Sequence, residues 1–212
     1  MKNIPVYATE FGVGSLILKD VPYTQTAYVR IESASSPKEF LEECISFCRV
    51  VGAEKIFATG HKVLEDYPFH TTICRMRCDC SVIPTSDANV FPVTEKTLNR
   101  WLEIYRGKMR NVANAAYMTD ADGREMLKRG DGYFIHRDGE LIGIGIANSN
   151  VIDLVASVTP GGGKEIVSAL SHALCDAEVT LDVASTNEKA IRLYESLGFI
   201  KTQELSNWYK IF

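Results

Sequence analysis

The stretch from Pro160 to Lys164 has the clearest potential for chemistry, because three consecutive glycines, Gly161–Gly163, precede a lysine there. A helical apolar stripe follows directly, formed by Ile166, Ala169, Leu170, Ala173 and Leu174. The first backbone N–H groups of a helix have no partner inside it, and the helix dipole adds positive potential, so such a start attracts anions. The segment therefore predicts a phosphate-binding loop; a plain flexible turn is the alternative.

A second segment, Asp182–Phe199, combines a strand, a capped helix and a glycine stop. Asn187 is a favoured N-cap residue, since its side chain accepts from the first free backbone N–H groups. Tyr194 falls on the same helical face, about two turns and ~10 Å further along. Gly198 can adopt the left-handed conformation that ends helices. A tyrosine phenol has a reference pKa of about 10, so Tyr194 can donate a proton, although a tyrosine on an apolar face is more often a core residue.

This segment resembles the Asn-x-x-Ala-x-x-x-Tyr-x-x-x-Gly-Phe signature of the GNAT (GCN5-related N-acetyltransferase) superfamily. The matching residues are Asn187, Ala190, Tyr194, Gly198 and Phe199. The order of elements expected from around residue 90 to residue 212 is also similar to that fold. The resemblance implies acetyl-CoA as co-substrate, no metal, and transfer of the acetyl group to a primary amine of a small molecule or peptide.

The resemblance also implies where the cofactor binds. In the family, the strand before the phosphate loop pairs through its backbone with the pantetheine arm, and the loop and helix start bind the pyrophosphate. The cofactor-binding residues implied in this way are Ala156, Ser157, Val158, Gly161, Gly162, Gly163, Lys164 and Asn187. The backbone N–H of Val158 matches the family's donor to the oxyanion of the tetrahedral intermediate.

Three side chains are candidates for proton transfer. Tyr194 matches the family's usual acid, which serves the departing CoA thiolate. The attacking amine must be neutral, so a base is also expected. Asp182 stands where many relatives have a Glu that acts through water, and Asp153 is a lone charge within the apolar segment Val151–Val158. Anchoring the local structure is the alternative role for both aspartates.

The glycine loop departs from the family pattern Gln/Arg-x-x-Gly-x-Gly/Ala. Glu165 and Val167 stand where small residues are expected, and Gly162 stands where Arg or Gln is expected. An acidic side chain beside a pyrophosphate weakens binding by like-charge repulsion. The departure motivates an alternative function, a non-catalytic ligand-binding or regulatory module with the GNAT fold.

Alternating strand and helix patterns must position these residues. Strands are expected at 15–19, 27–31, 55–59, 71–80, 133–136, 140–147, 151–158, 178–184 and within 201–212. Helices are expected after Ser36, with a capping box to Glu39, and over 98–105, 119–129, 166–174 and 187–197. Asp138-Gly139 predicts a tight hairpin turn. These elements predict an α/β fold, a mixed twisted sheet with helices on both faces, and the resemblance implies the acyl-CoA N-acyltransferase type.

The chain divides at a turn-rich stretch around residues 83–87. We expect an N-terminal α/β subdomain at 1–88 and a GNAT-like domain at 89–212. A faint repeat links them, because Pro37 and Pro160 each precede a helix that leads to an Ala-Glu pair, Ala53-Glu54 and Ala177-Glu178. The N-terminal half is therefore either a degenerate copy of the second half or a strand-rich extension of it.

Composition limits the possible partners. The 212 residues carry 23 Lys+Arg against 27 Asp+Glu without a basic cluster, which disfavours nucleic acid. No apolar run approaches the ~18 residues of a membrane helix, and the start lacks a signal pattern, so we expect a cytoplasmic protein with no membrane partner. The six cysteines should be reduced thiols, and their spacing favours packing over a metal site. The sequence does not determine the oligomeric state, and a homodimer is one option.

Overall fold

The computed structural model describes residues 5–174 and 176–212. The chain forms two compact units. Unit 1 extends to Ile73 and includes Glu204–Phe212, and unit 2 is Cys74–Gln203. The boundaries fall inside two long strands, β5 (Phe69–Asp79) and β11 (Ile200–Lys210), so each of these strands contributes to both units.

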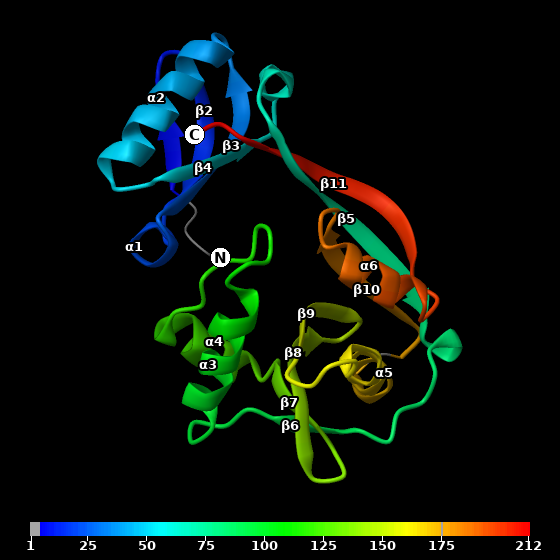
Figure 1. Ribbon diagram of the computed structural model, residues 1–212. Coiled ribbons are helices and arrows are strands. Elements are labelled where there is room, and N and C mark those ends of the chain that lie inside the picture. The colour runs from blue at the N-terminus through cyan, green and yellow to red at the C-terminus, as the bar shows by residue number, and fades with distance from the viewer. Residues whose placement is uncertain (1–4, 175) are drawn as a thin grey trace. The chain divides into compact units, whose positions relative to one another are not determined.

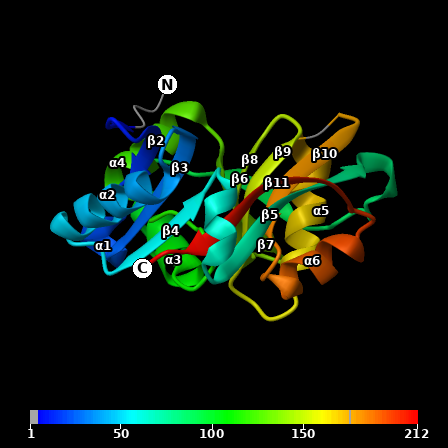
Figure 2. The same ribbon diagram turned by 90° about the horizontal axis from the view of Figure 1, so that it is seen from above.

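Unit 1 is a sheet with one long helix against it (Figures 1 and 2). Its other elements are β1 (Val6–Ala8), β2 (Gly12–Ile17), α1 (Val21–Thr24), β3 (Thr26–Ala34), α2 (Pro37–Val50), β4 (Lys55–Thr59) and the 3₁₀ helix η1 (Lys62–Asp66). The strand order is β1-β2-β3-β4-β11. Strands β3 and β4 are parallel and α2 connects them, so its apolar face is buried against the sheet.

The start of α2 differs from the expected capping box. Ser36 occupies the N-cap position, but its side chain makes no capping hydrogen bond. The backbone N–H groups of Ser35 and Ser36 both donate to the carbonyl of Phe11, at 2.9 and 3.1 Å. The entry into α2 is therefore held by a backbone contact with the β1–β2 turn, and the box with Glu39 was a wrong prediction.

Unit 2 carries the larger set of elements. They are η2 (Cys80–Val82), β6 (Asn89–Pro92), α3 (Leu98–Met109), α4 (Asp120–Arg129), β7 (Gly132–Arg137), β8 (Glu140–Asn148), β9 (Val151–Ser157), α5 (Gly163–Leu174), β10 (Glu178–Ala184) and α6 (Glu188–Glu195). The strand order is β11-β5-β10-β9-β8-β7-β6. Strand β10 is parallel to β9, whereas the neighbouring pairs β6–β7, β7–β8 and β8–β9 are antiparallel.

Helices cover both faces of the sheet in unit 2. Trp101 and Met126 of α3 and α4 are buried with Ile144 on one face, and Ile166 of α5 is buried with Ile135 on the other. Gly143 and Gly145 of β8 allow α5 to approach closely, because a Cβ there would overlap Ile166 and Leu170. The expected α/β architecture, with a mixed sheet and helices on both faces, is confirmed.

Most expected elements are present, with changed ends. The turn residues Asp138 and Gly139 both have positive φ, 52° and 81°, as the tight hairpin required. The short edge strands β1 and β6 and the single-turn helices were missed, because a few residues carry no measurable periodicity. In residues 5–174 and 176–212, no helix is both long and apolar enough to cross a membrane.

The two units share one topology. In each, an antiparallel strand pair (β2–β3, β8–β9) leads through a helix (α2, α5) to a strand parallel to the second (β4, β10). The faint repeat between Pro37 and Pro160 marks these two helix starts. The repeat is therefore visible in the order and direction of the strands.

Five of the six cysteines lie among the described residues, and these five are core residues; Cys175 lies outside the described residues. Cys44 and Cys48 belong to α2 and are fully buried, and Cys74, Cys78 and Cys80 are buried along β5 and just after it. Burial raises the pKa of Cys44 to about 12 and that of Cys48 to about 11. Among the described residues, no His, Cys, Asp and Glu side chains group as metal ligands. These thiols behave as small apolar side chains.

Candidate functional site

The sheet of unit 2 opens between β9 and β10. The two strands pair at only two positions, Val151 with Thr180 and Ile152 with Leu181, although both continue beyond them. A β-bulge follows at once, since Ile152 and Leu154 face consecutive residues of β8 and leave Asp153 as the extra residue. A bulge bends its strand. The rest of β9 is therefore unpaired on its β10 side, and we call this gap the seam.

The alternation of the backbone shows which residues face the seam. The N–H of Val158 donates to the carbonyl of Ile142 on the β8 side, at 2.9 Å. Backbone groups of alternate residues point to the same side of a strand, so those of Ala156 also face β8. The backbone groups of Val155 and Ser157 consequently face the seam, where a ligand chain can pair with them.

The glycine loop ends the seam and starts α5. Gly161 has a φ of +80°, a conformation that favours glycine. A Cβ on Gly162 would lie 2.8 Å from the hydroxyl of Thr159, and one on Gly163 would overlap Leu193 of α6. The N–H of Ile166 makes the first helical bond, to the carbonyl of Gly162 at 3.1 Å. The N–H groups of residues 163–165 precede that bond and point out of the helix start.

Glu165, the acidic departure in this loop, is neutralised by an arginine from another element. Arg137, at the end of β7, donates through Nη1 to Oε1 of Glu165 at 2.5 Å. The second carboxylate oxygen, Oε2, is buried without a hydrogen-bond partner in the described residues. The loop therefore carries a cation beside its acid, and the net repulsion expected from the sequence is reduced.

Asn187 is the N-cap of α6, and Tyr194 lies in the last turn of that helix. The Asn187 side chain accepts from the N–H of Ala190 at 3.3 Å, so the expected N-cap is confirmed. Tyr194 packs against the same buried cluster as Val155, with its ring 5.7 Å from that of Phe199. Burial raises the pKa of Tyr194 to about 12, so the phenol keeps its proton at neutral pH.

The two aspartates have different surroundings. Both oxygens of Asp182 accept from Arg75 of β5, at 2.8 and 3.0 Å, in a half-exposed bidentate pair. Asp153 is exposed at the bulge where the seam opens. Its charge contributes to the raised pKa of Arg129, which arises first from the hydrogen bond to Asp131. Asp153 is thus the aspartate adjoining the seam, and Asp182 is committed to an arginine.

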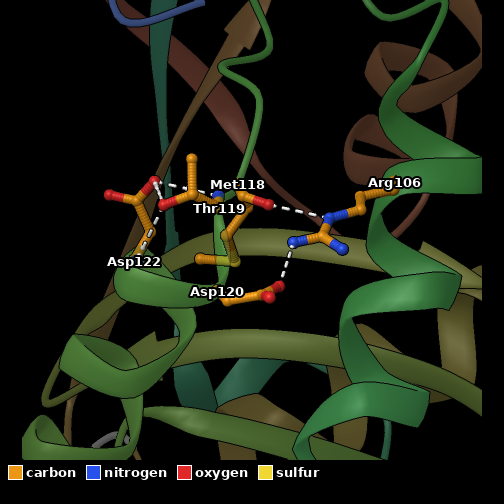
Figure 3. Close-up of polar contacts among 5 residues, drawn as sticks. All are labelled: Arg106, Met118, Thr119, Asp120 and Asp122. Carbon is orange, nitrogen blue, oxygen red and sulfur yellow. Dashed lines mark hydrogen bonds and ion pairs between the residues drawn. The ribbon is translucent and has the colours of Figure 1, made fainter. Parts of the chain in front are cut away.

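The connection between α3 and α4 is held firmly (Figure 3). Arg106 of α3 donates through Nε to the carbonyl of Met118 at 2.9 Å and pairs with Asp120 at 2.6 Å. Thr119 and Asp122 form a reciprocal capping box at the start of α4. These contacts fix the end of the connection before α4 begins.

Earlier in the same connection, the Tyr105 hydroxyl donates to the carbonyl of Ala116 at 2.8 Å. Asn114 adopts a left-handed conformation with a φ of 58°. Both polar atoms of its side-chain amide are buried without a hydrogen-bond partner in the described residues. Buried amides are almost always hydrogen-bonded, so this unsatisfied amide makes Asn114 a candidate for contact with a ligand.

Sequence reasoning missed four contributors to this site: Val155, Arg137, Arg75 and Asn114. The position of Val155 at the seam is recognised only when the pairing of β9 with β8 and β10 is known. The arginines lie on other elements than the acids they pair with, and no spacing in the sequence reveals them. Asn114 stands in a stretch without periodicity. The backbone groups of Ala156 and Val158 face β8, so the structure does not support the expected pairing of these two residues with the pantetheine arm or the oxyanion-donor role of the Val158 N–H. The roles assigned to Tyr194, Asp182, Asp153 and the other cofactor-binding residues remain predictions.

Comparisons with known proteins give the fold a name. No protein-family model and no curated protein matches the chain. Among solved structures, a functionally unknown conserved protein from Staphylococcus epidermidis ATCC 12228 is 12% identical with a TM-score of 0.60, over 99% of this chain and 94% of that one. A tandem GNAT protein from the clavulanic acid biosynthesis pathway is 12% identical with a TM-score of 0.53, over 94% and 78%.

A GCN5-related N-acetyltransferase from Anabaena variabilis ATCC 29413 is 10% identical, with a TM-score of 0.60, over 87% of this chain and 54% of that one. At these identities the likeness concerns the fold. The match to a tandem protein over most of the chain fits the repeated topology of the two units. The fold of this chain is that of the GNAT acetyltransferases.

Proposed function

We propose that the chain is an N-acetyltransferase of the GNAT superfamily that transfers an acetyl group from acetyl-CoA to a primary amine. The observation that carries the proposal is the seam between β9 and β10, which leads to the glycine loop and the free N–H groups of α5. An extended, amide-containing arm with a pyrophosphate at one end suits this combination of an open strand edge and an anion site.

Binding would use backbone groups at both ends of the seam. The amides of the pantetheine arm would pair with Val155 and Ser157 as an added strand. The pyrophosphate would accept hydrogen bonds from the N–H groups of residues 163–165, with Lys164 adding a charge. The pair of Arg137 and Glu165 would set the electrostatic potential there.

The transfer needs the amine nitrogen to attack the thioester carbonyl, form a C–N bond and break the C–S bond. The nitrogen loses a proton, and the sulfur leaves as the CoA thiolate. Tyr194 would donate a hydrogen bond to that sulfur. A thiol has an ordinary pKa of about 8.5, so a phenol at about 12 stabilises the thiolate without giving up its proton.

We propose Asp153 as the base; its position as the extra residue of the bulge, where the seam opens, supports this role. The acceptor would bind against the connection between α3 and α4, whose Met118 packs in the same cluster as Leu154 and Val158 of the β9 region. The unpartnered amide of Asn114 would supply polar recognition. A small-molecule or peptide amine is the substrate class.

Titration of the purified protein with acetyl-CoA, by calorimetry and thermal unfolding, tests the binding step. A ligand at a hundredfold over its Kd adds about 2.7 kcal/mol to the free energy of unfolding. Stabilisation by acetyl-CoA, with release of free thiol when an amine panel is added, would support the proposal. Absence of any shift at millimolar acetyl-CoA would refute it.

A second candidate function is a non-catalytic ligand-binding or regulatory module. The observation that favours it is the engagement of Asp182 by Arg75, because both oxygens of this carboxylate already accept hydrogen bonds from the guanidinium. Such a module would bind CoA without thiol release for any amine. The combined titration and thiol assay therefore separates the two functions.

A further inference from the structure

Unit 1 contains a groove along α2 that acetyl transfer would not use. It has a volume of about 500 Å³. Aromatic rings form one part of its lining, Tyr7 of β1, Phe11 of the β1–β2 turn and Phe47 of α2. Glutamates form another part.

The aromatic part is held in place from below. The rings of Tyr7 and Phe47 lie 5.3 Å apart, and Tyr7 is 6.1 Å from the fully buried ring of Phe40. Tyr7 pairs with Gly14 across the β1–β2 hairpin, and the missing Cβ of Gly14 makes room for Phe40. Phe47 is nevertheless 40% exposed. The rings thus present a fixed, accessible apolar surface.

Within residues 5–174 and 176–212, the acidic part has no compensating cation. Glu39, Glu42 and Glu43 lie within one turn of α2, and none of the described residues that line the groove is basic. In the described part of the chain, none of the three carboxylates forms an ion pair, and Oε2 of Glu43 is buried without a hydrogen bond. The neighbouring Arg49 lies over the ring of Phe212, at 4.7 Å.

Like charges one turn apart destabilise a helix, so this arrangement is costly without a cationic ligand. The pKa of Tyr7 is raised, first by burial and then by the charge of Glu43. The second contribution shows that the negative field of the glutamates reaches this ring. An anion would be repelled by these carboxylates. A neutral apolar ligand would bury them without compensation. Ring faces attract organic cations, and a carboxylate accepts strong hydrogen bonds from ammonium N–H groups.

We propose that this groove binds a small alkylammonium ion, with its N–H groups on Glu43 and its charge and methylene groups against Tyr7 and Phe47. Tyr7, Phe47 and Glu43 all belong to unit 1. The site is therefore separate from the acceptor site proposed for acetyl transfer in unit 2, and it would give the protein a second site for amines.

Calorimetric titration of the full chain with n-hexylammonium tests this site, with 1-hexanol as the neutral comparison and tyrosine fluorescence as a second signal. Hexylammonium should bind, more weakly as salt rises, and hexanol should not. Glu43→Gln should weaken binding about tenfold, and Phe47→Ala about fivefold. Glu65→Gln, an acid of η1 outside the groove, is the matched control and should change the Kd less than about twofold.

Equal binding of hexanol, or unchanged affinity in both groove variants with native circular dichroism, would overturn the proposal. So would a second copy of the chain as the true occupant, shown by dimers that Phe47→Ala dissociates and hexylammonium does not affect. Acetyl-CoA titration of the same samples reports on unit 2. A failure of acetyl-CoA binding therefore does not alter the result for the groove.

Discussion

Replacing Glu165 with glutamine should tighten acetyl-CoA binding, because this carboxylate lies in the first turn of α5, where the pyrophosphate would sit. Residues of one turn lie within ~5 Å along the axis, so we place the carboxylate and a bound phosphate about 7 Å apart. The Glu165 and Arg137 side chains are 37% and 47% exposed, so a solvent-like dielectric applies. Each pair of unit charges is then worth about 0.5–1 kcal/mol.

The variant also releases Arg137, which would then turn its guanidinium to the pyrophosphate. Together the two effects predict a Kd about five- to tenfold lower in Glu165→Gln. Arg137→Ala should raise the Kd by a similar factor, since it leaves Glu165 unpaired beside the anion. The double variant should bind close to the wild type, because it removes both charges.

Calorimetry at low and at physiological salt measures these constants. Arg192→Ala is the matched control, because Arg192 pairs with Glu188 on the exposed face of α6, at 2.6 Å, and should leave the Kd unchanged. The reasoning is refuted if Glu165→Gln weakens binding, or if both single variants bind as tightly as the wild type at either salt concentration. The glycine loop would then not hold the pyrophosphate.

Four further outcomes are expected. Tyr194→Phe should lower turnover about a hundredfold with an unchanged Kd for acetyl-CoA, measured by thiol release and calorimetry; unchanged turnover would assign the donor elsewhere. Gly145→Val should destabilise unit 2 by about 1–3 kcal/mol in urea unfolding, because the new side chain overlaps Leu170. Stability should fall between pH 9 and pH 11, because burial raises the thiol pKa of Cys44 and Cys48 from 9.0 to about 12 and about 11, so the unfolded chain ionises first; denaturant midpoints measured across this range check the slope. Calorimetry should give a stoichiometry of one acetyl-CoA per chain, because β3 pairs with all of β4 and leaves no gap like the seam between these two strands of unit 1.

Local signals in the sequence predicted local structure well. Strand β4 spans Lys55–Thr59, as the apolar run between turn residues indicated. The hairpin turn at Asp138-Gly139 and the cap at Asn187 form as expected, because each depends on the conformation of a few adjacent residues. The predicted capping box at Ser36 does not form, because the backbone N–H of Ser36 donates to the carbonyl of Phe11, outside α2. Propensity cannot anticipate such a tertiary contact.

The ion pairs of the candidate site could not be predicted from the sequence. Glu165 looked repulsive in the sequence, but Arg137, 28 residues earlier, neutralises it. Asp182 looked like a base, but Arg75, 107 residues earlier, holds both of its oxygens. The residue types and the helix start were predictable from spacing, whereas the electrostatics depends on which strands are neighbours in the sheet.

The difference between the two units lies in where each second strand carries its bulge. In β3 the extra residue is Glu32, beyond the five positions, Thr26–Arg30, that pair with β4. In β9 it is Asp153, directly after the two positions that pair with β10. Since a bulge bends its strand, an early bulge turns most of β9 away from β10, whereas a late one leaves β3 and β4 paired throughout. The same topology therefore gives a fully paired β3–β4 ladder in unit 1 and the seam in unit 2. The position of the bulge, which differs by a few residues between β3 and β9, determines which unit can admit an extended ligand.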